Sequence, residues 1–353
     1  MRLLYGVQAT GNGHISRARA MAKYLQENDI AVDFLFSGRN SNQLFDMQCF
    51  GSWQHRRGLT FSSHAGQIDY WQSFRQANLT ELWRDIHTLD THKYDLVITD
   101  FEPVTAWAAK KQGTPVLALG HQYAFLHKIP LQDDSYFSRS IFRHFAPAQK
   151  HIGLHWHHFN FSETQQATIA PPIIDLPDNQ LEADPKRVLV YLPFEDTEQV
   201  QQWLLPIRDY QFDIYGCPAL NGACHNSTIQ QSHLTFHPPS VATFKKHLAQ
   251  AGAVLSNAGF ELISEALQWQ KKILVKPLHG QMEQASNALA LAQLELAHRK
   301  NVLNTEHILA WLNGAAAKRK VKYPNVAEAI CRQLKNGNDF NSQALWDKTK
   351  FHE

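Results

Sequence analysis

A histidine and an aspartate in the first third of the chain are candidates for an acid–base pair, because each comes after a run of apolar residues. The apolar run Arg2–Val7 leads into a glycine-bearing segment, in which His14 directly follows Gly13. Asp100 directly follows a second apolar run, which ends at Thr99. An imidazole titrates near neutral pH, so His14 could accept a proton from a hydroxyl group. A carboxylate at a strand end could orient that imidazole and stabilise its protonated form.

Simpler interpretations of these residues stay open at the level of sequence. A loop histidine, one of 20 in the chain, need have no function. Asp100 could simply cap the helix that follows it, and Glu102 competes with it as the partner of His14. His121 and Gln122 follow the next apolar run, where α/β sheets bind ligands, and are candidates for contact with an acceptor.

A second group of polar residues lies around residue 260. The apolar run Ala253–Leu255 ends in Ser256, Asn257 and Gly259, and a helical pattern follows. A helix N-terminus presents unpaired N–H groups and a partial positive charge, and a glycine there lets a diphosphate approach the backbone. Ser256 or Asn257 would cap this helix without a ligand. Glu265, one to two turns on, could accept hydrogen bonds from ribose hydroxyls.

Each of these polar residues follows an apolar run that predicts a strand, and helical patterns lie between the runs. Such an order predicts doubly wound α/β domains, in which polar residues at strand ends face a crevice. With 353 residues the chain exceeds what one hydrophobic core usually serves, so we expect two domains. The predicted divisions are 1–167 for the first domain, 168–187 for a proline-rich linker, 188–335 for the second domain, and 336–353 for a tail that could return to the first domain.

Composition excludes several classes of function. The formal net charge of +2 argues against a general nucleic-acid-binding protein. The four cysteines lack metal-site or redox spacing, which predicts reduced thiols in a cytoplasmic protein. The Gly11-x-Gly13 segment lacks the third glycine of a dinucleotide fingerprint. No apolar stretch approaches the ~20 residues of a membrane span, and no signal peptide is evident, so we expect a soluble protein, or one peripheral to the membrane.

The residues around Gly259 carry a resemblance to a known group of enzymes. The order Gly259, Glu265, Pro277, Glu283-Gln284 and Asn287-Ala288 resembles the donor-binding signature of glycosyltransferases of the two-domain GT-B type. It is similar to the UDP-glycosyltransferases and to the family 28 enzymes that form lipid II by transferring N-acetylglucosamine. Within this group the chain looks closest to an uncharacterised bacterial and archaeal branch. The resemblance implies two Rossmann-like domains that face a cleft.

The resemblance also implies roles for single residues. Gly259 would hold the diphosphate, Glu265 the ribose, and Glu283 with Gln284 the sugar hydroxyls. His14 would be the general base, oriented by Asp100. The donor site is expected to comprise Gly13, Ser256, Asn257, Ala258, Gly259, Phe260, Glu265, His279, Gln281, Glu283, Gln284 and, at the position of the base-stacking aromatic, Phe236. The acceptor site is expected to comprise Asn12, Arg17, Glu102, His121 and Gln122.

The implied reaction is an inverting transfer from a nucleotide-diphosphate sugar, with UDP as the expected nucleotide, to a hydroxyl of a glycan or lipid-linked acceptor. No Asp-x-Asp sequence is present, so neither a metal ion nor another cofactor is expected. Nucleotide-sugar hydrolases and epimerases of the same fold share the segment Gly11–Arg17 and remain an alternative. A binding protein without catalytic activity is a second alternative.

Overall fold

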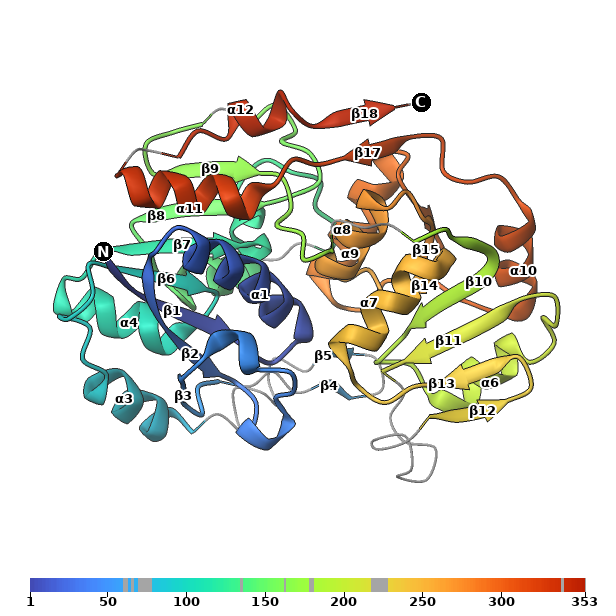
Figure 1. The fold of residues 1–353 in the computed structure, drawn as a ribbon, viewed down its shortest axis with the longest axis horizontal. Coiled ribbons are helices and arrows are strands. Elements are labelled where there is room, and N and C mark those ends of the chain that lie inside the picture. The colour runs from blue at the N-terminus through green and yellow to red at the C-terminus, as the bar shows by residue number, and fades with distance from the viewer. Residues whose placement is uncertain are drawn as a thin grey trace.

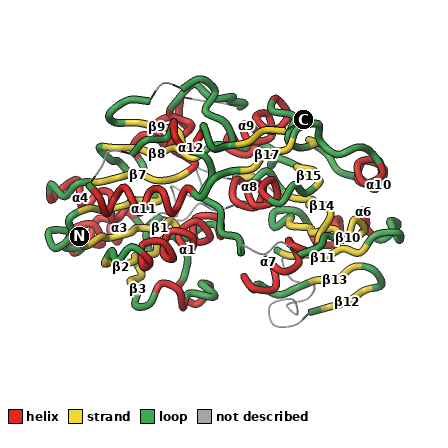
Figure 2. The backbone as a smooth tube through the Cα atoms, turned by 45° about the horizontal axis from the view of Figure 1, so that its top comes forward, coloured by secondary structure: helices red, strands yellow, loops and turns green. Residues whose placement is uncertain are grey.

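The computed structural model describes residues 1–59, 63–64, 67–68, 78–133, 136–161, 163–177, 181–216, 228–337 and 340–352. The chain forms two lobes, each built on a seven-stranded sheet (Figure 1). Strands run through the middle of each lobe, with helices around them (Figure 2). The predicted fold class, two doubly wound α/β domains, is confirmed.

The first sheet has the order β3-β2-β1-β6-β7-β8-β9, and every neighbouring pair is parallel. Its strands are β1 (Arg2–Gln8), β2 (Ala31–Ser37), β3 (Trp53–His55), β6 (Leu96–Asp100), β7 (Val116–Gly120), β8 (Lys150–Leu154) and β9 (Ala167–Ala170). The strand order reverses between β1 and β6. Because ligands of such sheets bind at the carboxyl ends of the strands beside this reversal, the loops after β1 and β6 are the expected site.

Helices cover both faces of the first sheet because alternate residues of each strand point to opposite faces. Leu4 of β1 packs in one cluster with Val104 of α4, while Tyr5 packs in another with Met21 of α1. The helices of this domain are α1 (Asn12–Glu27), α3 (Leu79–Thr88), α4 (Pro103–Gln112) and α5 (Tyr136–His144), with short 3-10 turns η1 (Ser41–Gln43), η2 (Gln48–Phe50) and η3 (His121–Leu126). A two-stranded ribbon joins β4 (Ser63–His64) to β5 (Gln67–Ile68).

The second sheet has the order β12-β13-β11-β10-β14-β15-β16, and only β12 runs antiparallel to its neighbour. Its strands are β10 (Asp184–Tyr191), β11 (Gln211–Tyr215), β12 (Ile229–Gln231), β13 (Leu234–Phe236), β14 (Ala251–Ser256), β15 (Lys272–Val275) and β16 (His298–Arg299). Here the order reverses between β10 and β14, so the loop after β14 is an expected ligand site in this domain, as the loop after β1 is in the first.

Helices also cover both faces of the second sheet. Val188 of β10 packs with Val200 of α6, and its neighbour Leu189 packs in the cluster that contains Ile263 of α8. The helices are α6 (Thr197–Leu204), α7 (Val241–Gln250), α8 (Phe260–Gln268), α9 (Met282–Gln293) and α10 (Thr305–Asn313).

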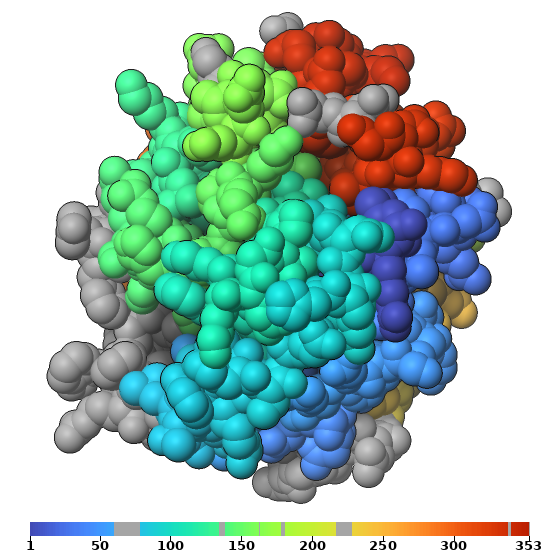
Figure 3. Space-filling model, turned by 90° about the vertical axis from the view of Figure 1, so that its left-hand side faces the viewer, coloured from blue at the N-terminus to red at the C-terminus, as the bar shows by residue number. Residues whose placement is uncertain are grey.

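The chain passes between the domains after β9 and returns near its end. Thr168–Ala170, expected in the linker, pairs with β8 instead, so the connection between the sheets is shorter than the proline content suggests. The C-terminal elements are β17 (Lys320–Lys322), α11 (Val326–Asn336), α12 (Gln343–Trp346) and β18 (Lys350–His352). Trp346 Nε1 donates to the Ile169 carbonyl at 2.7 Å. Figure 3 shows these C-terminal residues lying against the first domain.

None of the helices in the described part of the chain combines the length and the apolar character that crossing a membrane requires.

Candidate active site

A cavity of about 580 Å³ lies between the two domains, within the size range of small-molecule sites. The first domain contributes residues from the loop after β1 and from α1 and α5, and the second contributes residues from α7, α8 and α9. Twelve predicted site residues line it: Asn12, Gly13, His14, Gln122, Ser256, Asn257, Gly259, Phe260, Glu265, Gln281, Glu283 and Gln284. A second hollow, of about 620 Å³, contains none of the predicted residues.

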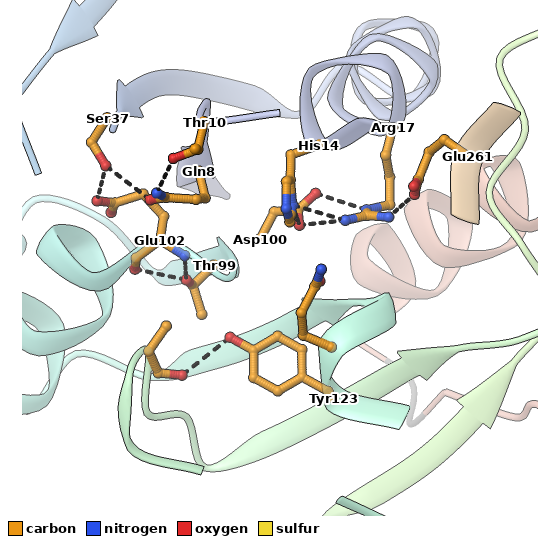
Figure 4. Close-up of polar contacts among 12 residues, drawn as sticks. Gln8, Thr10, His14, Arg17, Ser37, Thr99, Asp100, Glu102, Tyr123 and Glu261 are labelled. Atoms are coloured by element: carbon orange, nitrogen blue, oxygen red, sulfur yellow. Dashed lines mark hydrogen bonds and ion pairs between the residues drawn. The ribbon is translucent and has the colours of Figure 1, made fainter. Parts of the chain in front are cut away.

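His14 lines this cavity, and Asp100 contacts it from the buried side, behind the lining (Figure 4). Nδ1 of His14 lies 2.7 Å from Oδ1 of Asp100, although the two residues are 86 positions apart. The helix α1 follows the short loop after β1 and carries His14, and Asp100 ends the neighbouring strand β6. The His14 side chain is 14% exposed and that of Asp100 is fully buried. With Nδ1 held by the carboxylate, Nε2 is the nitrogen left to accept a proton from a ligand.

Arg17 completes this group. Its Nε and Nη2 donate to the two oxygens of Asp100 at 2.7 and 2.6 Å, and Nη1 pairs with Glu261 of α8. Burial alone would raise the pKa of Asp100, but Arg17 and His14 beside it hold that pKa below its usual value. The aspartate therefore stays ionised and can stabilise a protonated imidazole. Because Arg17 is 1% exposed, the prediction that it contacts the acceptor is corrected to a role in holding Asp100.

Glu102 has a structural position, which corrects its predicted contact with an acceptor. It is fully buried and forms the N-cap of α4, accepting from the backbone N–H groups of Val104 and Thr105 at 2.9 and 2.7 Å. Ser37 Oγ donates to the same carboxylate at 2.6 Å. All of these donors belong to the domain core, so Glu102 neither reaches the cavity nor competes with Asp100 for His14.

Glu265 lines the cavity from α8 and is almost completely buried, at 3% exposure. Its Oε1 pairs with Lys245 of α7 and accepts from Ser16 Oγ at 3.3 Å. Burial raises the pKa of Glu265 despite the Lys245 ammonium. Both contacts are made to Oε1, so a ribose that enters this part of the cavity would meet a carboxylate already fixed in position.

The start of α9 places Glu283 and Gln284 at the cavity wall. Glu283 Oε2 accepts from Gln122 Nε2 at 3.2 Å, a contact that joins the two domains. Gln284 Oε1 accepts from the backbone N–H of Leu278 at 3.1 Å. Three side-chain amide oxygens around the cavity are buried without a hydrogen-bond donor, namely Gln122 Oε1, Asn257 Oδ1 and Gln281 Oε1. Hydroxyl groups of a sugar are the kind of donor that these oxygens lack.

Four further predicted residues lie outside the cavity lining. Phe236 is 1% exposed within β13 and Ala258 is fully buried, so neither can contact a donor directly. His279 is exposed but does not line the cavity. His121 is fully buried, with Nε2 at 2.7 Å from Asn287 Oδ1, so its predicted contact with an acceptor is corrected to a contact between the domains.

The N-termini of three helices share an unusual property. Helices α1, α8 and α9 begin at the cavity, after Gly11, Gly259 and Gln281, and no N-cap side chain bonds to the first turn of any of them. The four-residue helix α12 also lacks such a bond, but it begins away from the cavity. The predicted capping of α8 by Ser256 or Asn257 is therefore wrong. Six other described helices, α3, α4, α6, α7, α10 and α11, are capped by a side chain, and of their N-caps only Ser240 reaches the cavity. Three helix N-termini without a side-chain cap thus lie at one space, and their partial positive charge favours an anion there.

The comparison with known families decides what kind of enzyme has this geometry. The family described as Glycosyl transferase family 1 matches residues 1–314. The chain belongs to glycosyl transferase family 1. The predicted class of enzyme, a glycosyltransferase, is thereby confirmed. No protein of curated function matches the chain by sequence.

Solved structures of glycosyltransferases share the fold of this family 1 member along the whole chain. The kitacinnamycin glycosyltransferase aligns at a TM-score of 0.61 with 12% identity, covering 98% of both chains. A Phytolacca americana enzyme, solved with UDP-2-fluoro-glucose and pterostilbene, gives 0.60 with 15% identity and 98% of both chains. MurG of Acinetobacter baumannii gives 0.54 with 15% identity and 99% of both chains. At these identities the likeness establishes the GT-B fold alone, as the sequence predicted.

Sequence reasoning missed several residues that line the cavity of this glycosyltransferase. Lys245, Arg19, Arg39 and Tyr191 all face it. A lysine or arginine within a helix or loop carries no local signal, because most such residues are solvated. Tyr191, the last residue of β10, could have been found from its place at the carboxyl end of a strand beside the reversal.

One group of potential metal ligands occurs among the described residues of this glycosyltransferase. Asp213, His237 and His247 each offer an atom within 4.8 Å of the others. Both carboxylate oxygens of Asp213 are engaged by Arg187, at 2.5 and 3.0 Å, and Tyr215 Oη lies 2.9 Å from His247 Nδ1. A guanidinium in contact with the carboxylate opposes a cation, so the group is better explained as an ion-pair network beneath Tyr215.

Proposed function

We propose that the protein transfers a sugar from a nucleotide-diphosphate sugar, with UDP as the expected nucleotide, to a hydroxyl group of an acceptor, with inversion at the anomeric carbon. The observation that carries this proposal is that α8 and α9 of the second domain begin without side-chain caps at one cavity that also contains His14. A diphosphate is the leaving group that such N–H groups stabilise.

The proposed reaction is a single displacement. His14 Nε2 takes the proton of the acceptor hydroxyl while that oxygen forms a bond to the anomeric carbon. The bond from this carbon to the diphosphate oxygen breaks, and the nucleotide diphosphate leaves with the electron pair. Asp100, held ionised by Arg17, stabilises the protonated His14, and the N-termini of α8 and α9 stabilise the charge on the leaving diphosphate. No step of this proposed reaction requires a metal ion, and the independence of the reaction from metal ions stays a prediction.

The donor sugar is proposed to lie against the start of α9. Glu283, Gln281 and Gln122 offer oxygen atoms to its hydroxyls, and Glu265 offers a carboxylate to the ribose. The Phytolacca americana enzyme of the same fold was solved with a UDP-sugar, which supports UDP as the first nucleotide to test. A glycan or lipid-linked acceptor, a cytoplasmic location and a peripheral contact with the membrane stay predictions of the sequence.

The test of the base is turnover of UDP-sugars with a panel of hydroxyl-bearing acceptors, measured as UDP release with and without acceptor. We expect acceptor-dependent release, and His14→Ala should lower kcat by about 100-fold or more, because general base catalysis contributes about 10²–10⁴-fold. The control is His92→Ala, which removes an exposed histidine of the same domain that does not line the cavity. Unchanged kcat in His14→Ala would remove the base assignment, and UDP release that ignores every acceptor would favour hydrolysis.

A further inference from the structure

Two arginines of the first domain face the cavity without a carboxylate partner. Arg19 extends from α1 and Arg39 from the loop that follows β2, and both side chains are partly buried. No ion pair between either arginine and a carboxylate occurs within the described ranges. The acidic residues nearby are engaged elsewhere, since Asp46 accepts from the backbone N–H of Val241 at 2.8 Å and Asp175 lies 3.8 Å from Lys245.

The hydrogen bonds of the two arginines leave charge and donor capacity unused. Arg19 Nη2 donates to the backbone carbonyls of Phe45 and Asp46 at 2.9 and 3.3 Å, while its Nε is buried and has no acceptor. Arg39 Nε donates to the Ala9 carbonyl at 2.7 Å, and Nη2 donates to Asn12 Oδ1 at 2.9 Å. All four acceptors are neutral groups, so neither guanidinium is neutralised.

Burial changes the pKa of the Arg39 guanidinium. Burial, and to a smaller extent the neighbouring Arg19, lower the pKa of the Arg39 guanidinium, which shows that its charge is disfavoured where it stands. Burying like charges side by side costs free energy unless a counter-charge joins them. The Asn12 and Gly13 backbone at the uncapped start of α1 adds partial positive charge to the same wall of the cavity.

We propose that Arg19, Arg39 and the N-terminus of α1 form a binding site for an anionic group of the phosphate class carried by the acceptor. The three features all belong to the first domain. The donor diphosphate has separate provision in the second domain, where α8 and α9 begin without side-chain caps. Arginine suits such an anion because its planar guanidinium can donate two parallel hydrogen bonds to a phosphate.

This inference rests on the proposed transfer reaction and narrows its acceptor to a molecule with a negative charge. Apolar side chains from the first domain line the same cavity, namely Phe45, Phe101, Ile141 and Phe142. An acceptor with an anionic group beside an apolar part would match both kinds of surface. A neutral polyol would leave the two guanidinium groups without a counter-charge.

The test is calorimetric titration of inorganic pyrophosphate into the protein saturated with UDP, so that the donor position is filled. We expect pyrophosphate to bind, and Arg19→Gln and Arg39→Gln each to weaken its affinity about tenfold or more, as loss of a charge-assisted hydrogen bond implies. The affinity for UDP should change less than twofold. Arg332→Gln is the matched control, because that arginine is exposed on α11 and does not line the cavity.

Thermal unfolding of each variant establishes that it is folded before the titration is interpreted. If UDP does not bind, the proposed function is contradicted. The same variants are then titrated with pyrophosphate alone, and weaker binding of pyrophosphate by Arg19→Gln and Arg39→Gln would still support the anion site. The proposal is overturned if pyrophosphate does not bind the UDP complex. It is equally overturned if the arginine variants weaken UDP instead of pyrophosphate, because the arginines would then serve the donor.

Discussion

At the scale of single residues, the chemistry depends on how Asp100 divides its charge between two partners. Its Oδ1 is within 2.7 Å of both His14 Nδ1 and Arg17 Nη2. His14 and Arg17 are three positions apart on α1, so the same helix face presents both to one carboxylate. The arginine fixes the aspartate and balances its charge in the buried floor of the site, and the aspartate in turn orients the imidazole.

Asp100→Asn tests this division of charge. The substitution removes one of the two carboxylates that pair with the buried Arg17 and leaves Glu261, so we expect the free energy of unfolding to fall by about 1.5–3 kcal/mol in urea titrations. The transfer rate should fall about 100-fold or more, because His14 loses the group that stabilises its protonated form. The double variant Asp100→Asn/Arg17→Met should regain part of the stability without regaining the rate. Recovery of both together would mean that Asp100 acts only through folding.

The sequence predicted the His14–Asp100 pair but not the role of Arg17. Two strand ends beside a reversal of strand order meet in any doubly wound sheet, so the pairing follows from local pattern and topology. The i,i+3 spacing of His14 and Arg17 was a usable signal for the arginine. The contact of Arg17 with Glu261 was not predictable, because it depends on how the two domains meet.

At the scale of elements, the glycines show which helix ends are packed and which are kept open. A Cβ at Gly6 of β1 would lie 2.9 Å from Glu102 Oε2 and closer still to Thr105 Oγ1, so α4 packs directly on that glycine. A Cβ at Gly259, the N-cap of α8, would meet nothing within 4 Å. The first glycine therefore serves packing, while the second leaves room at an uncapped helix end.

The matched pair Gly6→Ala and Gly259→Ala tests this difference. Gly6→Ala should lower the free energy of unfolding by about 1–3 kcal/mol, measured by urea denaturation, because the added methyl overpacks the α4 interface. Gly259→Ala should change stability little, since its φ of −74° suits alanine, but weaken UDP about tenfold by obstructing the diphosphate. Equal UDP affinity in Gly259→Ala and the unaltered protein would contradict a diphosphate at the start of α8.

Element order was predictable, whereas capping and the limits of the linker were not. The apolar runs at β1, β6, β7 and β14 all form strands, because continuous apolar residues suit sheets buried on both faces. Glu102 was misassigned because an acidic residue before a proline at the start of a helix is compatible both with an N-cap and with a residue that contacts an acceptor. The β9 strand was hidden by the prolines that follow it.

At the scale of the whole molecule, the two domains meet through specific buried contacts. Trp156 Nε1 donates to Ser264 Oγ at 2.9 Å, and the ring of His121 stacks on Phe260 with centroids 3.9 Å apart. These partners are more than 100 positions apart, so no local pattern could have predicted them. The position of the cavity wall, and with it the roles of His121 and Arg17, follows from this interface.

Buried histidines give the whole molecule a dependence on pH. Burial lowers the pKa of His127, His157 and His247 to about 4. It also lowers the pKa of His121, His151 and His155 below the usual value. Between those values and 6.5 the unfolded chain binds more protons than the folded one, so stability rises with pH and is lost as pH falls through this window. Two glutamates with raised pKa, Glu102 and Glu265, act in the opposite direction but are fewer.

We therefore expect the melting temperature to fall steadily as the pH is lowered from about 6.5 to about 4, measured by calorimetry in buffers of constant ionic strength. His127→Phe should flatten the dependence, because one proton that distinguishes the two states contributes about 1.4 kcal/mol per pH unit. Phe161 lies beside the His127 ring and offers an aromatic neighbour to the replacement. An unchanged slope in this variant would show that His127 does not titrate on unfolding.

The most direct test of the central claim is the thermal stabilisation of the protein by millimolar UDP, dTDP, GDP and ADP, with Glu265→Ala as the control. A ligand that binds only the native state raises its stability, by about 2.7 kcal/mol at a concentration 100 times its Kd. We predict that UDP raises the melting temperature most and that the effect is lost in Glu265→Ala, because the ribose loses its carboxylate. If none of the four nucleotides shifts the melting temperature, the proposed donor site between the domains is contradicted.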